Sequence, residues 1–267
     1  MLFIRSLIFN IAFYVTTAVW MIVFTPFYFI GPRKKAWWAP NFWSRCNVWL
    51  LRHIVGVRFE VSGTENIPTT GFIIAPKHQS AFDTFCFLPW LTDPVLILKR
   101  ILMWVPLFGW YVARMKMIPI DRGNREQAIR KVNAGAKYAL ANDRQLLIYP
   151  EGTRRAPGAA PSYKSGIAYL YENLDVPVVA IAHNAGLFWP KNSFLRYPGT
   201  LKAEFLPPIE PGLSRAAFQA RLIAETETAC DRLLLEVADS PNPPPFGPDA
   251  QKRIAQLRAA IAETQPS

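Results

Sequence analysis

The sequence predicts an α/β fold in which a mixed, largely parallel sheet is flanked by helices and preceded by an N-terminal membrane-associated helical segment. An apolar run without charged residues occupies the amino end. From about residue 56, short runs rich in Val, Ile and Leu alternate with helical stretches, which is the pattern of a sheet covered on both faces. We therefore expect membrane-anchoring helices over residues 1–55, an α/β domain over 56–239, and a Pro-rich linker with a C-terminal tail over 240–267.

The composition excludes several classes of protein. Hydrophobic residues make up 51% of the chain and charged residues only 18%, below the roughly 25% of soluble domains, which excludes a disordered chain. Cys46, Cys86 and Cys230 lie far apart, so we expect neither a disulfide framework nor a metal site, and reduced thiols favour the cytoplasmic side. The formal charge of +11 indicates a polyanionic partner, either nucleic acid or an anionic membrane with phosphorylated small molecules.

The amino end favours the membrane. No charged residue occurs from Ser6 to Gly31, and the part up to Thr25 would span about 30 Å as a helix, the thickness of a bilayer's hydrocarbon core. The cluster Arg33-Lys34-Lys35 suits lipid headgroups. Apolar residues at helical spacing from Trp38 to Leu50 predict an amphipathic helix at the interface.

A signal peptide and a buried core helix both fit this segment less well. A cleaved signal peptide would have a shorter apolar run with small residues at its end, and few buried core helices are apolar all round for so long. The sequence leaves open whether the first helix spans the bilayer or forms, with the second helix, a hairpin that dips into one leaflet.

The remaining elements follow from the periodicity of apolar residues. Apolar spacing of three and four residues predicts helices over Arg125–Ala141 and Arg215–Val237, and the run TFCFLPWL after Asp83 also indicates a helix. The proline-rich run from Ser240 predicts a linker, followed by a short, isolated helix over 249–264. Short apolar runs predict seven strands: Val57–Val61, Phe72–Ala75, Val95–Leu98, Met117–Ile120, Leu146–Tyr149, Val178–Ala182 and Leu201–Leu206.

A histidine and an aspartate follow the second expected strand. His78 lies just beyond its carboxyl end, where open α/β sheets place their sites. Asp83 comes five residues later, near the start of the expected helix, and its carboxylate can accept the Nδ1 proton of His78. This would leave Nε2 free as a general base. The helix start would also provide a favourable field for anions. On spacing alone, a capping or core role for His78 is the more common alternative.

Two more strand ends carry groups suited to phosphate. The strand ending at Tyr149 is followed by Glu151-Gly152-Thr153-Arg154, in which the glycine permits close backbone approach, and the threonine and arginine supply a hydroxyl and a bidentate guanidinium. Asp121-Arg122 follows another strand and puts a second guanidinium on the same edge. Together with the histidine and aspartate, these strand ends predict one site.

The region between Thr84 and Arg155 contains 12 Lys and Arg against five Asp and Glu, so this half of the domain forms a cationic funnel. The alternative is a solvated basic face. We assign that role to four of these residues, Lys99, Arg100, Lys131 and Lys137.

Four segments, His78–Asp83, Ile120–Arg122, Tyr149–Arg154 and Val176–Val179, resemble in order and spacing the four blocks of the glycerolipid acyltransferases. The likeness is closest to the 1-acyl-sn-glycerol-3-phosphate (lysophosphatidic acid) acyltransferases and covers about residues 57–210. It implies transfer of an acyl chain from acyl-CoA or acyl-carrier protein to the sn-2 hydroxyl of 1-acyl-sn-glycerol 3-phosphate, which makes phosphatidic acid. No further cofactor is implied. The hydrophobic amino end is similar to that family's membrane anchor, so we expect a catalytic domain on the cytoplasmic face of a membrane.

By position, the resemblance makes His78 the general base and Asp83 its orienting partner. It assigns the glycerol phosphate to Arg122 and to the loop residues Glu151, Gly152, Thr153 and Arg154, with Lys164 and Gly166 as a further phosphate-side element. The sequence departs from many relatives, which have Asn, Phe and Pro in place of Lys77, Tyr149 and Ala180. These departures leave the acyl-chain and acceptor preference open. His183, at another strand end, is interpreted as a packing residue.

Three alternatives remain. The first is a sister acyltransferase acting on another lysophospholipid or on a lyso-aminolipid. The second is a hydrolase with Ser80 as nucleophile, which is disfavoured because residues two apart seldom meet and the sequence has no G-x-S-x-G elbow. The third is a non-catalytic protein that binds anionic lipid or nucleic acid. The apolar amino end and the lack of a nucleic-acid motif disfavour nucleic acid as a partner.

Overall fold

A seven-stranded sheet forms the centre of the protein, in the order β1-β7-β6-β2-β5-β3-β4. β6 and β7 run antiparallel, with Ala182 opposite Glu204, whereas the other neighbouring pairs are parallel. The predicted mixed, largely parallel sheet is confirmed, and each predicted strand is present with ends within two residues of those expected. The strands are β1 (Val57–Ser62), β2 (Ile73–Pro76), β3 (Pro94–Lys99), β4 (Ile118–Ile120), β5 (Gln145–Leu147), β6 (Val178–His183) and β7 (Gly199–Phe205).

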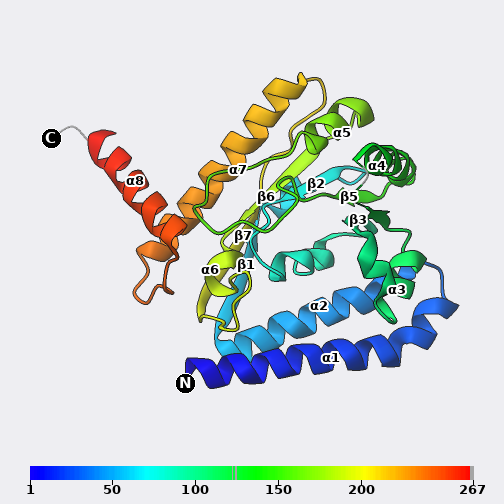
Figure 1. The fold of residues 1–267 in the computed structure, drawn as a ribbon, viewed down its shortest axis with the longest axis horizontal. Coiled ribbons are helices and arrows are strands. Elements are labelled where there is room, and N and C mark those ends of the chain that lie inside the picture. Colours follow the sequence, from blue (N-terminus) through cyan, green and yellow to red (C-terminus); the bar gives the residue numbers. More distant parts are fainter. Residues whose placement is uncertain (122, 124, 265–267) are drawn as a thin grey trace.

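The computed structural model describes residues 1–121, 123 and 125–264. The sheet lies between two layers of helices, with α4, α5 and α7 above it and the pair α1 and α2 below it (Figure 1). The helices are α1 (Leu2–Ile30), α2 (Trp38–Leu50), α3 (Phe108–Arg114), α4 (Arg125–Leu140), α5 (Gly166–Leu174), α6 (Ala185–Phe188), α7 (Arg215–Ala238) and α8 (Pro248–Thr264). The two long helices predicted in the domain are therefore present as α4 and α7.

Successive side chains of the central strands point to opposite faces of the sheet, so that each face has its own core. In β2, Ile73 packs into the cluster that faces α4, α5 and α7, and Ile74 packs into the cluster on the face of α1 and α2. Both side chains are fully buried, as expected for a strand covered on both faces. A central strand of this kind gives its carboxyl end a rigid position, and His78 follows that end directly.

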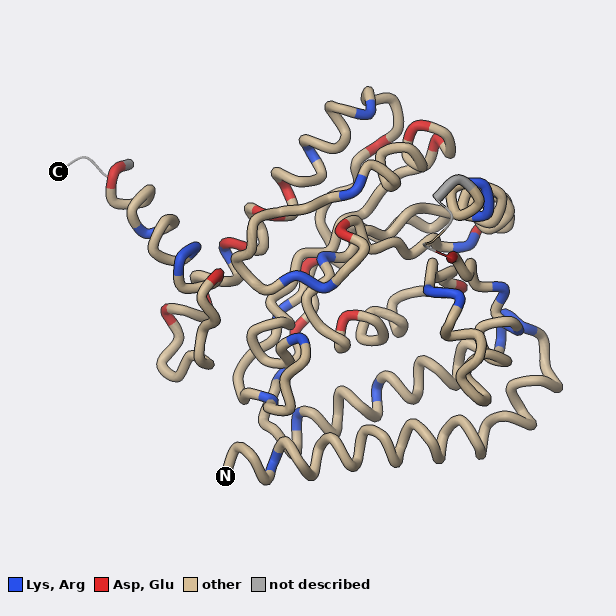
Figure 2. Tube along the Cα trace, viewed as in Figure 1, with Lys and Arg blue, Asp and Glu red and all other residues tan. Residues whose placement is uncertain are grey.

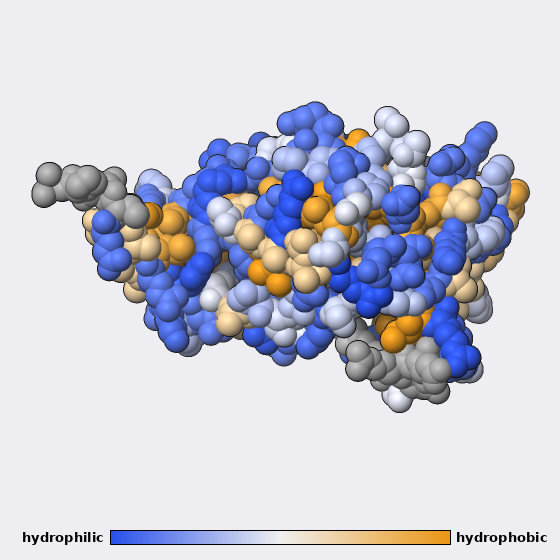
Figure 3. Space-filling view, turned by 90° about the horizontal axis from the view of Figure 1, so that it is seen from above, coloured by the Kyte–Doolittle hydropathy of each residue, from blue (hydrophilic) through white to orange (hydrophobic). Residues whose placement is uncertain are grey.

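α1 and α2 form a helical hairpin along one side of the domain, and few charges lie on it (Figure 2). α1 continues through Pro26 to Ile30, beyond the end expected at Thr25. Only 6% of the residues in its most apolar 18-residue stretch are buried, which is contrary to a buried core helix. The upper face of the molecule, by contrast, is largely hydrophilic (Figure 3).

One of the three cations assigned to lipid headgroups has another partner. Both terminal nitrogens of Arg33 donate to the carboxylate of Asp93, at 2.6 and 2.7 Å, and Trp37 donates to the same group at 2.9 Å. Burial raises the pKa of Asp93, but the hydrogen bonds from Arg33 and Trp37, together with the charges of Arg144 and Arg33, outweigh burial and hold that pKa below its usual value. Arg33 therefore fastens the hairpin to the domain, and Lys34 and Lys35 are left exposed.

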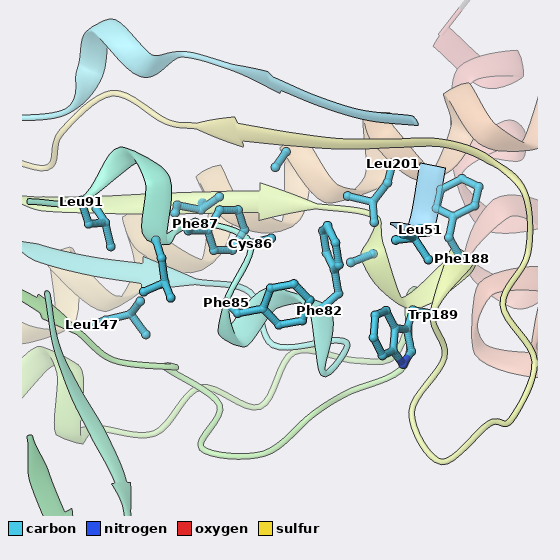
Figure 4. Close-up of a cluster of buried hydrophobic side chains, with 14 of the residues drawn as sticks. Leu51, Phe82, Phe85, Cys86, Phe87, Leu91, Leu147, Phe188, Trp189 and Leu201 are labelled. Carbon is cyan, nitrogen blue, oxygen red and sulfur yellow. The ribbon is translucent and has the colours of Figure 1, made fainter. Parts of the chain in front are cut away.

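Two predictions of local structure are wrong. The run after Asp83 forms two short 3-10 turns, Phe82–Thr84 and Leu88–Trp90, because most of its apolar side chains are buried in the core and Pro89 cannot donate a helical hydrogen bond. Phe82, Phe85 and Phe87 pack in the same core as Trp189 (Figure 4). The C-terminal helix is not isolated, since it joins the core through two of its side chains, Ala250 and Ile254.

Candidate active site

The turn that follows β2 closes around the carboxylate of Asp83. Asp83 Oδ1 lies 3.0 Å from His78 Nδ1, and Oδ2 accepts the backbone N–H groups of Gln79 and Ser80, each at 2.8 Å. Asp83 is fully buried, whereas His78 is partly exposed. This arrangement suits an imidazole that carries its proton on Nδ1 and keeps Nε2 available for proton transfer. The expected helix start is absent from this part of the described chain, so two backbone N–H groups hold the carboxylate instead.

Tyr149 packs directly against His78. Its ring stacks on that of His78 with the centroids 4.0 Å apart, and its hydroxyl donates to the backbone carbonyl of Asp83 at 3.0 Å. Burial raises the pKa of Tyr149 well above its ordinary value, which keeps the hydroxyl neutral. The sequence shows this tyrosine only as a departure from the phenylalanine of many relatives, whereas the structure gives its hydroxyl a hydrogen-bond partner.

Glu151 faces the protein interior, where it pairs with the residue before the histidine. Lys77 Nζ donates to Glu151 Oε1 at 3.0 Å and to Glu227 Oε1, on α7, at 2.5 Å. Tyr163 donates to the same Glu227 oxygen at 2.9 Å. Burial lowers the pKa of Lys77, but the two carboxylates outweigh burial and raise that pKa above its usual value. Sequence reasoning could not place this network, because its members lie up to 150 residues apart.

The loop after β5 brings the backbone of Arg155 against that of His78. Gly152 has a φ of +66°, which a residue without a side chain adopts readily, and the backbone N–H of Arg155 donates to the carbonyl of His78 at 2.7 Å. Thr153 and Lys164 are exposed at the rim, as is Gly166 at the start of α5. Of the candidate phosphate groups, Arg122 lies outside the described residues.

Two hollows with basic walls lie along this end of the sheet. One, of about 510 Å³, is lined by Gln79, Arg154, Arg155 and Lys191 among others. The other, of about 540 Å³, is lined by Lys99, Arg100, Ile101, Trp104, Ile120 and Asp121, at the carboxyl ends of β3 and β4. Lys99 and Arg100, which the sequence assigned to a solvated basic face, therefore border a concave surface. Within the described residues, no group of three or more His, Cys, Asp and Glu could hold a metal ion.

His183 is buried next to the histidine–aspartate motif and contacts the residue before it, Lys77, and its last residue, Asp83. Its Nε2 is 2.6 Å from the carbonyl oxygen of Lys77 and 3.6 Å from Asp83 Oδ2. Burial lowers the pKa of His183, so the ring is neutral and donates from Nε2. The interpretation of a packing residue is too simple, because this ring also positions the backbone before His78. The available signal was its place at the end of β6, which neighbours β2.

Comparison with known proteins agrees with these motifs. Residues 58–184 match the sequence model of the family described as Acyltransferase. The chain is 37% identical over 227 residues to a 1-acyl-sn-glycerol-3-phosphate acyltransferase of Pseudomonas aeruginosa, which covers 83% of this chain and 85% of that protein. It is 29% identical over 188 residues to the Saccharomyces cerevisiae protein of the same name, across 67% of this chain and 60% of that protein.

The fold is also that of a solved structure. The crystal structure of the 1-acyl-sn-glycerophosphate (LPA) acyltransferase PlsC from Thermotoga maritima superposes with a TM-score of 0.74 at 23% identity, and covers 87% of this chain and 98% of its own. The chain therefore belongs to the acyltransferase family of the 1-acyl-sn-glycerol-3-phosphate acyltransferases, as its motifs predict, and is an enzyme that transfers acyl groups.

Proposed function

We propose that the protein transfers an acyl chain from a thioester to the sn-2 hydroxyl of 1-acyl-sn-glycerol 3-phosphate, making phosphatidic acid, with His78 as the general base. The observation that carries this proposal is the 3.0 Å contact between His78 Nδ1 and the buried carboxylate of Asp83. The substrate follows from the relative that shares 37% identity over most of both chains.

In this reaction His78 Nε2 removes the proton of the acceptor hydroxyl while its oxygen attacks the thioester carbonyl. Collapse of the tetrahedral intermediate breaks the carbon–sulfur bond, and the imidazolium returns its proton to the leaving thiolate. Asp83 stabilises the imidazolium and keeps the ring oriented. General-base catalysis supplies about 10²–10⁴-fold, and holding both substrates in a reactive geometry supplies about 7–11 kcal/mol. A thioester is already activated, so the step needs no metal.

The acceptor phosphate would lie near Arg154 and the exposed Lys164, whose backbone N–H is tied to the carbonyl of Pro150 at 2.8 Å. Guanidinium and ammonium groups suit a phosphate monoester, and a guanidinium can bind it through two parallel hydrogen bonds. Gly152 and Thr153 would allow close backbone approach and supply a hydroxyl. Glu151 would act indirectly, by anchoring the loop to Lys77.

The membrane would hold the enzyme through the hairpin of α1 and α2. α1 contacts the domain near both of its ends: Ser6 Oγ accepts the backbone N–H of Arg196 at 3.0 Å, and Thr25 Oγ1 lies 3.1 Å from the hydroxyl of Tyr111. A helix fastened along the domain in this way favours a hairpin in one leaflet over a single transmembrane span. The three free cysteines suit a cytoplasmic face.

The test uses the full chain in mixed micelles with lysophosphatidic acid and acyl-CoA or acyl-carrier protein, and follows thiol release and diacyl product together. We expect matched thiol and phosphatidic acid, and a loss of at least about 10²-fold in His78→Ala. His53→Ala is the matched control, because His53 is exposed just after α2. Retention of more than about a tenth of the rate in His78→Ala would reject the general base.

The same experiment separates the alternatives. Product formed only with another lysolipid would identify a sister acyltransferase with a different acceptor. Thiol release without diacyl product would indicate a thioesterase. If neither donor released thiol with any lysolipid, the proposed activity would be wrong.

A further inference from the structure

The connection between β3 and β4 exposes large apolar side chains. The segment Ile101–Trp110, here called the aromatic turn, leaves 66% of Ile101, 78% of Trp104 and 60% of Trp110 accessible, and Val105 and Phe108 are also exposed. Exposed apolar residues are common singly, but a contiguous group of them marks an interaction surface. The proposed acyltransferase mechanism makes no use of these side chains.

The backbone holds this surface in a defined shape. Gly109 packs so closely on Met103 that an added Cβ would lie 2.0 Å from the Met103 carbonyl oxygen, and its N–H donates to the carbonyl of Val105 at 2.9 Å. Leu107 has a φ of +62°, which is strained for a residue with a branched side chain. A strained turn that directs two tryptophans outward is more consistent with a contact surface than with a loose loop.

α3, into which the aromatic turn continues, is fastened to the carboxyl-terminal part of α1. The Tyr111 hydroxyl donates to the Met21 carbonyl at 2.9 Å, and the Tyr111 ring stacks on Tyr28 with centroids 4.0 Å apart. Arg114 also donates to the carbonyl of Gly31. Figure 1 shows α3 beside the end of α1 that leads to α2. Phe27, Phe29 and Ile30 are exposed at that end, so the turn extends the apolar surface of the helix.

Charge and residue type indicate a lipid surface. Residues 100–120 contain three basic residues, Arg100, Arg114 and Lys116, and no acidic residue. Tryptophan prefers the interface between headgroups and acyl chains, and basic side chains are attracted to anionic lipids. The turn also borders the hollow at the ends of β3 and β4, because Ile101 and Trp104 line it.

We infer that the aromatic turn is a second lipid-contacting surface, carried by the catalytic domain itself and continuous with the exposed end of α1. It holds the carboxyl ends of β3 and β4 against the bilayer, so that a lipid acceptor reaches the site without leaving the membrane. This inference rests on the proposed membrane location of the enzyme.

The first experiment locates Trp110 directly. The full chain is bound to vesicles of phosphatidylcholine and phosphatidylglycerol in which a fraction of the phosphatidylcholine carries bromine in its acyl chains, a short-range quencher of tryptophan fluorescence. Trp110→Phe should remove part of the quenchable fluorescence. Trp90→Phe is the control, since Trp90 lies on a 3-10 turn and is packed, partly buried, against the core. If Trp110→Phe removes only unquenched fluorescence while the wild-type protein is bound, the inference is wrong.

The second experiment measures the consequence for turnover. Val105→Ser/Trp110→Ser changes two exposed side chains that do not line either hollow. The KM for lysophosphatidic acid embedded in the same vesicles should rise about tenfold, the scale of returning one large apolar side chain to water. KM and kcat for a short-chain, monomeric lysophosphatidic acid should stay within about twofold of wild type, as should both values in the exposed-site control Leu213→Ser.

An equal rise in KM for both acceptors, or an unchanged KM for the acceptor in vesicles, would overturn the inference. If the double variant does not fold, the quenching experiment with Trp110→Phe decides alone. Failure of the proposed function is distinguishable, because a wild-type protein that does not bind vesicles or has no acyltransferase activity fails before any variant is compared.

Discussion

At the residue scale, the proposed chemistry depends on one turn of six residues, His78–Asp83. His78 receives its orientation from Asp83, and Asp83 receives its own from two backbone N–H groups. Such short-range hydrogen bonds make the carboxylate rigid before substrate arrives, which is the preorganisation that acid–base catalysis requires. The residue before this turn, Lys77, is itself fixed. Its carbonyl accepts from His183 and its ammonium donates to Glu151.

Asp83→Asn tests the orienting role. The amide keeps the shape of the side chain but cannot stabilise an imidazolium, and it favours the wrong tautomer. We therefore expect kcat to fall by about 10³- to 10⁴-fold with little change in the acceptor KM. Steady-state kinetics measures kcat and KM, and circular dichroism checks that the variant is folded. Asp143→Asn, at an exposed position with a φ of +55° that asparagine tolerates, is the control. A decrease in kcat of less than about tenfold would contradict the assignment.

Lys77→Met tests the buried charge network. Removing the ammonium leaves the buried Glu151 carboxylate without its partner, which is expected to cost about 3–5 kcal/mol of unfolding free energy. Lys77→Met/Glu151→Gln should recover much of this loss, because no unpaired charge remains at Glu151. Urea unfolding of the two single variants and the double variant forms a double-mutant cycle. Strictly additive effects would mean that the 3.0 Å contact carries no coupling.

The pH dependence of stability tests His183. Burial lowers its pKa, so the folded protein binds this proton less readily than the unfolded chain, in which histidine titrates at about 6.5. The stabilisation is complete above that pH and is lost as the pH falls toward the folded-state pKa. We expect the unfolding free energy to fall by up to about 1.4 kcal/mol per pH unit in this window. Urea unfolding at several pH values should show a smaller slope in His183→Gln, and an identical slope would contradict the assignment.

At the element scale, α1 has two different faces. One stripe, which includes Ser6, Phe9 and Tyr28, is buried against the domain, and the opposite side exposes aliphatic residues along the whole helix. A soluble helix would carry charges on the exposed side. The aliphatic side is therefore the surface that we expect to contact acyl chains.

Val15→Lys/Val19→Lys tests this surface. Both valines are exposed on α1, so the lysines should not disturb packing against the domain. A lysine costs about 2.5 kcal/mol or more within the hydrocarbon core, and the pair should weaken vesicle binding at least about 10²-fold. Vesicle flotation measures the bound fraction. Ile129→Lys, on α4, is the control. Unchanged flotation of a folded double variant would place the membrane contact elsewhere.

At the scale of the whole molecule, the contacts between the hairpin and the domain fix the position of the candidate site relative to the proposed membrane surface. α1 is fastened to the domain near both ends, and the segment that follows β6 supplies both Arg196, which contacts Ser6, and Lys191, which lines a hollow beside the histidine motif. The connection between β6 and β7 therefore links the hairpin to the candidate site.

Membrane topology provides the corresponding test. A hairpin in one leaflet keeps the amino terminus and the catalytic domain on the same side, whereas a single span separates them. A peptide tag on the amino terminus of vesicle-bound protein should be removed by added protease together with the domain. Complete protection of the tag until detergent is added would show a transmembrane span instead.

Much of the fold could be predicted from the sequence, because its signals are local. The seven strands and the helices α4 and α7 follow from runs and periods of apolar residues, and His78 and Asp83 lie five residues apart. The prediction of a helix after Asp83 was wrong because burial of Phe82, Phe85 and Phe87 on several sides overrides the local pattern.

The strands, the apolar first helix and the histidine–aspartate motif could be read from the sequence, since each depends on spacing within a few residues. Only the tertiary structure decided that Lys77 joins Glu151 to Glu227, that His183 supports the motif, and that the aromatic turn lies at the end of α1. The reason is that these contacts join residues far apart in the sequence. Hydrogen bonds and ion pairs between buried groups depend on where distant strands and helices come together, and no periodicity along the chain encodes that meeting.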